Sequence, residues 1–270
     1  MTGSGARIVM TDLFPWAIGV VAFLYAAVGH AGATGYVAVM TLAGVAPAEI
    51  RPAALLLNVV VAAIATVQFA RAGYLRLGFL VPLALASAPC AWLGGRTTLP
   101  VHWLEALLGA VLAWSAVQQA IASVPKPSEP AAPPLPRALP TWQLALLGGA
   151  IGLLSGLTGV GGGIFLTPAL LAARAAPLKT VAGVTAPFIL VNSIAGLVAL
   201  GMSASAPQIA GKTVVAAAAI GGLLGSQAGA FQLPVRSLRV LLAIVLAIAS
   251  LKMLGTSIGQ LLADPLAGGT

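Results

Sequence analysis

The sequence predicts an all-α fold, a polytopic bundle of transmembrane helices. Hydrophobic residues make up 60% of the 270 residues and charged residues only 7%, whereas a soluble domain carries about 25% charged residues. A soluble globule of this size has too little interior to bury so much apolar surface. The apolar residues also gather in ten stretches, which Gly, Pro and charged residues separate. We therefore expect the chain to cross a lipid bilayer several times.

Five apolar stretches precede residue 123 and five follow residue 140. They cover 13–29, 33–45, 52–70, 77–95 and 102–122, and then 142–157, 163–176, 181–201, 211–231 and 235–262. A membrane helix needs about 20 apolar residues, and six stretches are close to this length. Two stretches, 33–45 and 163–176, are short and follow Gly-rich turns, so we expect broken or re-entrant helices there.

Residues 123–140 divide the chain into an N-terminal repeat, 1–122, and a C-terminal repeat, 141–270. This segment contains seven Pro and three charged residues. Such a composition is incompatible with a helix and predicts an extended linker outside the bilayer.

The two halves resemble one another in sequence. The offset that separates Asn58 from Asn192 also relates Leu99–Val101 to Leu233–Val235. We therefore predict two pseudo-symmetric repeats, an arrangement common in secondary transporters. Five crossings per half invert the second copy, whereas four leave the copies parallel. The distribution of Lys and Arg favours inverted copies.

Charge and cysteine content exclude several classes of protein. The net charge is +8, but the basic residues are scattered singly, which predicts contact with membrane lipid and no nucleic-acid binding. The alternative is a mild preference for anionic solutes. The single cysteine, Cys90, has no disulfide partner, and no spacing of ligand residues predicts a metal site. The two histidines, His30 and His102, provide no plausible catalytic partner for Ser155. We expect no enzyme activity and no cofactor.

A glycine run in the second half predicts a helix break inside the membrane. The run covers Ser155–Gly163, and Pro168 follows it. Glycines at this density expose backbone N–H groups that lipid cannot satisfy. A helix that starts near Gly163 directs the N–H groups of Gly161, Gly162 and Gly163, with its positive dipole end, at a point that suits an oxyanion. The alternative is that the glycines only permit close helix packing.

The matching segment of the first half contains fewer glycines and adds His30. A histidine within the membrane is a candidate to hold an anion or to couple transport to protons. The alternative is a hydrogen-bonded structural histidine. We expect hinges or helix breaks in both segments, at Gly32, Gly35, Gly159 and Pro168.

Two amides lie in otherwise apolar stretches, Asn58 and Asn192. A buried amide needs partners, so the two either bond across to other helices or face a shared cavity. Thr158, Thr185 and Ser193 are weaker candidates for the same cavity. No acid lies in the middle of a stretch, which argues against a carboxylate relay for cations or protons and favours a negative substrate.

These motifs resemble the TauE/SafE family of membrane proteins, also called the sulfite exporter or toluene-sulfonate uptake permease family. The resemblance rests on Ser155–Pro168, Pro177–Thr185 and Asn192–Ser193, and the two-half layout extends it over nearly the whole chain. The first half departs from the family, because His30, Ala31, Ala33 and Thr34 replace its usual Gly-rich run. The resemblance implies a multi-pass carrier in the bacterial inner membrane for sulfite or for small organosulfonates such as sulfoacetate.

We therefore expect a secondary active transporter, an exporter of sulfur-containing oxyanions that works by alternating access around a central site. Backbone N–H groups of Gly161–Gly163 would hold the small anionic substrate together with His30, Asn58, Thr158, Thr185 and Asn192. The alternatives are an anion channel, a carrier of a different small organic anion and a membrane scaffold subunit. The sequence leaves the oligomeric state open, with a homodimer as one option.

Overall fold

The structure is a computed structural model that describes residues 3–97, 100–124, 139–201 and 211–231, with short pieces between 246 and 259. The described residues form helices and turns only. The helices are α1 (Gly3–Ala26), α2 (Ala33–Leu42), α3 (Pro47–Arg71), α4 (Leu77–Arg96), α5 (Val101–Ser123), α6 (Thr141–Thr158), α7 (Gly163–Ala172), α8 (Leu178–Ala199) and α9 (Lys212–Phe231).

The predicted stretches match these helices to within a few residues at most ends, so the prediction of an all-α fold is confirmed. The largest difference is at α1, which begins at Gly3 and so extends about ten residues before the predicted stretch 13–29. The tenth stretch, 235–262, lies largely outside the described residues, although its described pieces are helical. Most of the Pro-rich linker, residues 125–138, also lies outside them. The same holds for Leu99 and for Leu233–Val235.

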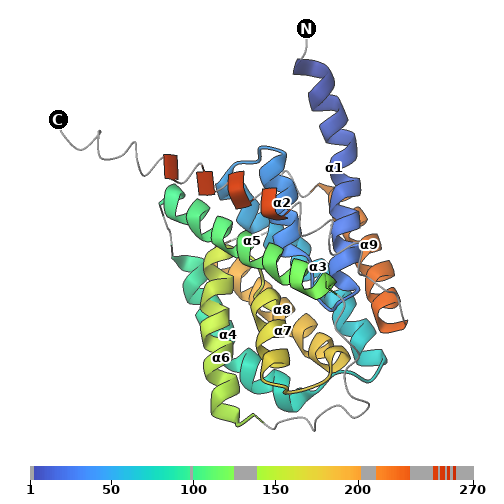
Figure 1. Ribbon diagram of the computed structural model, residues 1–270, viewed down its shortest axis with the longest axis vertical. Coiled ribbons are helices and arrows are strands. Elements are labelled where there is room, and N and C mark those ends of the chain that lie inside the picture. The colour runs from blue at the N-terminus through green and yellow to red at the C-terminus, as the bar shows by residue number, and fades with distance from the viewer. Residues whose placement is uncertain are drawn as a thin grey trace, which may run out of the picture.

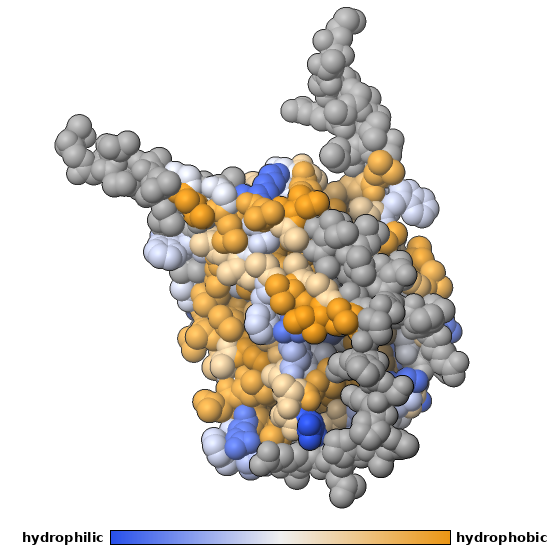
Figure 2. All heavy atoms as spheres, viewed as in Figure 1, coloured by the Kyte–Doolittle hydropathy of each residue, from blue (hydrophilic) through white to orange (hydrophobic). Residues whose placement is uncertain are grey.

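Four helices are long and apolar enough to cross a membrane, among the residues described. They are Ala48–Arg71 of α3, with α4, α6 and α8. Large apolar side chains also cover the outside of the molecule, as at Trp16 and Leu85, which are 74% and 72% exposed. Figure 2 shows apolar residues over much of the part of this face that is coloured by hydropathy. The chain is therefore a multi-pass membrane protein, because such a surface requires hydrocarbon and not water around it.

The helices form two outer pairs around a central pair (Figure 1). One outer pair is α4 with α6, and the other is α1 with α9. Between them, α3 packs against α8, while α4 also contacts α8 and α3 also contacts α9. The short helix α2 lies against α3, and α7 lies against α8. Each outer pair therefore joins a helix from the first half of the chain to one from the second.

Glycine allows each outer pair to pack with its backbones in contact. A Cβ added to Gly152 of α6 would lie 2.3 Å from the carbonyl oxygen of Ser87 in α4, and one added to Gly225 of α9 would lie 2.0 Å from that of Phe23 in α1. Similar contacts recur one turn earlier and one turn later along α6 and α9. In each pair, residue numbers at the contacts increase in the same direction along both helices. The helices of each outer pair therefore run parallel.

The central helices run antiparallel. Gly196, near the end of α8, lies against the side chain of Leu55, near the start of α3, where an added Cβ would be 3.1 Å from Leu55 Cδ1. Because α2 leads directly into α3 and α7 leads directly into α8, the turns at 43–46 and 173–177 lie on opposite sides of the molecule (Figure 1).

Backbone geometry around α2 recurs around α7. The two helices each contain ten residues, and their first residues are Ala33 and Gly163. Positive φ angles occur around α2 at Gly29, Gly32 and Gly44, and they recur with the same spacing around α7 at Gly159, Gly162 and Arg174. The two short helices therefore begin and end with the same backbone turns.

The close contact between α4 and α6 predicts different effects for two neighbouring glycines of α6. Gly152→Ala should lower the free energy of unfolding by about 1–3 kcal/mol, because the methyl group forces the two backbones apart. Gly149→Ala is the matched control, since its Cβ would meet no atom closer than Cys90 Sγ at 3.5 Å. The control should be neutral or stabilising by up to about 1 kcal/mol through helix propensity. Thermal unfolding of the detergent-solubilised protein measures both, and equal shifts would contradict the packing argument.

Candidate functional site

The loop between α6 and α7 places unpaired backbone donors inside the protein. Helix α6 ends at Thr158, and the N–H of Gly159 donates to Ser155 O at 2.8 Å. Within the described chain, the N–H groups of Gly161, Gly162 and Gly163 meet no backbone acceptor. These three residues are buried. Consecutive free donors thus lie at the amino end of α7, where the helix dipole adds positive potential.

Gly161 is the point at which this loop meets both central helices. A Cβ added to Gly161 would lie 2.6 Å from Asn58 Nδ2 of α3 and 3.2 Å from Ser193 Oγ of α8. Its φ of 76° is also in the left-handed region, which side chains rarely adopt. Only glycine allows the loop to come this close to Asn58 and Ser193.

Buried polar side chains lie beside this loop at Asn58, Ser155 and Ser193, and Asn192 precedes Ser193 on α8. Among the described residues, neither amide atom of Asn58 or of Asn192 has a hydrogen-bond partner, and neither do the hydroxyls of Ser155 and Ser193. All four side chains are 0% exposed. Leaving a buried polar group unpaired costs about 1–3 kcal/mol. The expected alternative, an interhelical hydrogen bond from each Asn, is not formed, and the cluster is therefore suited to a polar guest.

Two of the predicted hydroxyls are already engaged within the protein. Thr158 Oγ1 donates to Leu154 O at 2.7 Å, one turn back along α6, and accepts a hydrogen bond from the N–H of Val160 at 3.4 Å. Thr185 Oγ1 lies 3.2 Å from Thr167 Oγ1. Thr158 and Thr185 thus border the loop, but their hydroxyls stabilise its surroundings.

His30 connects the two broken segments. Its Nε2 lies 3.1 Å from the carbonyl oxygen of Gly163, so a proton on Nε2 makes a hydrogen bond between the segment before α2 and the start of α7. The Tyr25 ring packs edge-on against the imidazole at a centroid distance of 6.3 Å. The structure therefore brings His30 next to Gly163, at the end of the glycine loop.

The four residues predicted as hinges or helix breaks have different environments. Gly32 and Gly159 adopt left-handed conformations at helix ends. Gly35 lies inside α2, where an added Cβ would be 2.4 Å from Val21 Cγ1, so its small size serves packing against α1. Pro168 lies within α7.

The sequence interpretation missed a buried cation beside the loop. Arg51 of α3 is 8% exposed, and its Nη2 donates to Gly94 O at 2.9 Å and to Gly95 O at 2.8 Å. Arg51 was missed because it lies near the start of an apolar stretch, where basic residues usually face lipid head groups. Its neighbours Ile50 and Ala54 on α3 are fully buried, but this burial comes from the packing and is not visible in the sequence. Glu105 of α5 is similarly buried.

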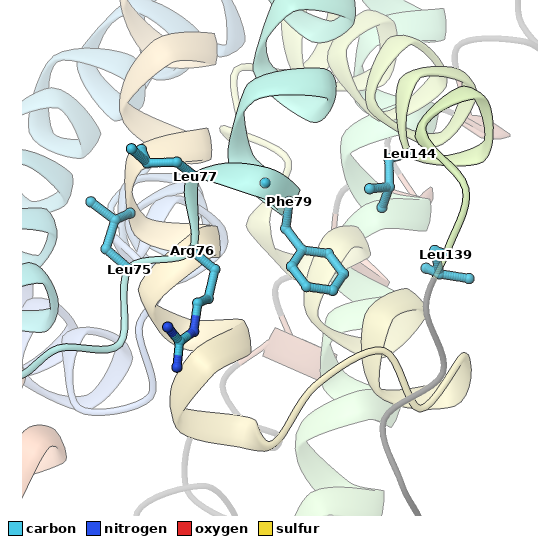
Figure 3. Close-up of a pocket in the computed structure, with 7 residues that line it drawn as sticks. Leu75, Arg76, Leu77, Phe79, Leu139 and Leu144 are labelled. Atoms are coloured by element: carbon cyan, nitrogen blue, oxygen red, sulfur yellow. The ribbon is translucent and has the colours of Figure 1, made fainter.

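A separate surface pocket of about 390 Å³ lies where α4 and α6 begin. Arg76 and Phe79 line it (Figure 3) together with Leu75, Leu77, Gly78, Leu139 and Leu144. None of the predicted site residues borders this pocket. It lies at the start of α6, whereas the glycine loop follows the end of the same helix, about 26 Å away along an 18-residue helix.

The fold and the enclosed polar cluster define a multi-pass helical membrane protein with an internal polar site. The sequence profile described as Sulfite exporter TauE/SafE matches residues 14–253, and the chain belongs to this family of membrane transporters. It is 39% identical over 240 residues to the Probable membrane transporter protein y4hK of Sinorhizobium fredii, covering 87% of this chain and 94% of that protein. No solved structure matches the chain. Both descriptions are of transport proteins, which are not enzymes in the usual sense.

The unpaired amides predict that removing one of them stabilises the protein. Asn192→Leu should raise the free energy of unfolding by about 1–3 kcal/mol, because it removes a buried amide that has no partner. Ser250→Ala is the control, because Ser250 Oγ donates to Gly109 O at 2.8 Å and its loss should be destabilising. Thermal unfolding without substrate compares the two. A strongly destabilised Asn192→Leu protein would show that the amide has an internal partner.

Proposed function

We propose that the protein is a secondary active transporter that exports sulfur-containing oxyanions, such as sulfite or small organosulfonates, across the bacterial inner membrane. The observation that carries the proposal is the cluster of buried polar atoms without partners around Gly161. The relative's printed name supports transport in general, and the family description supports sulfite and an outward direction.

The chemistry of the cluster favours an anion with several oxygens. Its available donors are the amides of Asn58 and Asn192, the hydroxyls of Ser155 and Ser193 and the backbone N–H groups of Gly161–Gly163. The only obligate acceptors among these groups are the two amide oxygens. A sulfonate or sulfite group presents three oxygens that accept hydrogen bonds, and it satisfies donors that are otherwise buried at a cost. We assign proton coupling to His30, because an imidazole titrates near neutral pH and this one touches the loop.

We further propose that residues 1–122 and 141–270 are two inverted repeats. The recurrence of the backbone turns of α2 around α7 supports this organisation. The packing of α1–α4 supports it too. If α1 corresponds to α6 and α4 corresponds to α9, the contact α1–α9 matches α6–α4, and the contact α3–α9 matches α8–α4. The antiparallel course of α3 and α8 supports inversion. Helices α2 and α7 are then the broken half-helices whose amino ends meet at the site.

A carrier fits the cluster better than an anion channel. Asn58, Asn192, Ser155 and Ser193 are fully enclosed, whereas a conducting pore keeps its ion site in contact with water on both sides. Alternating access then consists of moving the outer pairs relative to α3 and α8, so that the site opens to one side at a time. A different small organic anion is the second candidate cargo, because the donors do not by themselves select sulfur.

Counterflow in proteoliposomes tests the substrate and the mechanism together. Vesicles loaded with unlabelled sulfoacetate should accumulate labelled sulfoacetate in a saturable manner, because a carrier exchanges its substrate across the membrane. Sulfite should compete, whereas malonate, a dicarboxylate of similar size, should compete weakly. Asn58→Leu should reduce exchange at least tenfold through loss of a hydrogen bond to a charged group.

Ser226→Ala is the control for this experiment, because Ser226 is buried but bonded to Leu223 O of its own helix. Anion conductance without exchange would support the channel. Exchange of malonate in preference to sulfoacetate would support the other organic anion, and no exchange by folded protein would reject the proposed substrate class.

Cysteine accessibility tests the inverted repeats. In a Cys90→Ala background, Ala43→Cys and Ala172→Cys place single thiols at the carboxyl ends of α2 and α7, where both positions are exposed. In intact cells, a membrane-impermeant maleimide should label one of the two and not the other, because inversion puts these ends on opposite sides. Labelling of both in permeabilised cells is the control. Equal labelling in intact cells would indicate parallel repeats.

A further inference from the structure

Arg51 is a buried cation that the proposed binding groups do not include. Its side chain is 8% exposed, and its Nε has no hydrogen-bond partner among the described residues. The guanidinium donates to two backbone carbonyls, those of Gly94 and Gly95, and no carboxylate among the described residues is bonded to it. A charged residue inside a membrane protein is costly and marks a functional site by default.

The contacts of Arg51 fix it between three helices. The carbonyls that it binds lie at the carboxyl end of α4, where the helix dipole is negative and favours a cation. Gly94 packs on Leu153 and Leu157 of α6, with an added Cβ only 2.5 Å from Leu153 O. The guanidinium is thus held in place without a counter-ion to cancel its charge.

Arg51 also borders the glycine loop. An added Cβ at Gly159 would lie 2.7 Å from Arg51 Cγ and 3.2 Å from Arg51 Cα. Asn58 follows Arg51 by seven residues on α3, which places it two turns away on the same helix face, about 10 Å along the axis. The stem of Arg51 thus packs against the loop, while its guanidinium lies at the carbonyls of Gly94 and Gly95, so the charge would act on a substrate at Gly161 through space and not by contact.

We propose that Arg51 is a specificity-determining residue, which favours substrates with two negative charges over substrates with one. The inference rests on the proposed function and names the charge class of its cargo. Coulomb attraction over about 10 Å at an effective dielectric constant near 20 changes affinity by on the order of tenfold per substrate charge. The factor by which the cation raises the affinity for a dianion is thus about the square of the factor for a monoanion.

The matched pair of substrates is isethionate and sulfoacetate. Both are two-carbon sulfonates, but isethionate carries one negative charge and sulfoacetate carries two at neutral pH. Counterflow gives the half-saturating concentration of each. Arg51→Gln should raise this concentration about tenfold for isethionate and about a hundredfold for sulfoacetate, so the preference between them changes about tenfold. Arg51→Lys keeps the charge and should keep the wild-type preference.

Arg71→Gln is the control variant. Arg71 lies at the other end of α3 and is exposed, so both half-saturating concentrations should stay unchanged. If Arg51→Gln does not fold, Ala54→Asp provides the test, because it places a carboxylate one turn from Arg51 and neutralises the charge while keeping the guanidinium. It should produce the same loss of preference for sulfoacetate.

Equal losses for both anions in Arg51→Gln would overturn the inference, since they would mean that Arg51 only holds the helices together. A lost preference in Arg51→Lys would overturn it as well, because the charge would not be the cause. If the wild-type protein exchanges neither anion, the proposed function fails and the inference falls with it. If the wild-type protein exchanges the anions and Arg51→Gln keeps the wild-type preference between them, the inference about Arg51 is rejected but the proposed function is not.

Discussion

The interruption of helices within the apolar interior is the constraint on which the rest of this structure depends. Hydrocarbon provides no hydrogen bonds, so every backbone group freed by a break must be enclosed by protein. The N–H groups of Gly161–Gly163 are enclosed in this way by α3, α6 and α8. Enclosure keeps these donors away from lipid and water. In the proposed transporter the same donors bind the solute, so the binding chemistry and the architecture have one physical origin.

The outer pairs provide the rigidity that such an enclosure needs. Carbonyl oxygens of α4 and α1 lie where a Cβ of their glycine partners would be, and contacts this close leave little freedom to slide or tilt. The central contacts near Gly161 involve side chains that lack partners. The molecule thus combines two tightly packed outer pairs with a polar centre whose side chains lack hydrogen-bond partners. A bound solute would therefore stabilise the centre more than it stabilises the outer pairs.

The sequence predicted the helices well because Gly, Pro and charge mark the ends of apolar runs, and α7 ended early only because the chain turns at Ala173 and Arg174. It singled out Asn58, Asn192 and the glycine run because polar groups are rare in such sequence. Spacing does not reveal that Thr158 bonds to its own helix, an interaction that any helical Thr makes locally. Nor does it reveal Arg51, because burial near a helix end depends on which neighbours cover it.

The exchange of partners between the halves also has a consequence for biosynthesis. Helix α1 ends at Ala26, yet its parallel partner α9 begins only at Lys212. During translation the first helix enters the bilayer long before the glycines that fit its carbonyls have been made. It must wait in lipid, or beside the insertion machinery, with one face unpacked until α9 has been made. Contacts this far apart in sequence form late and slowly, so the newly made first half depends on the membrane itself as its temporary partner.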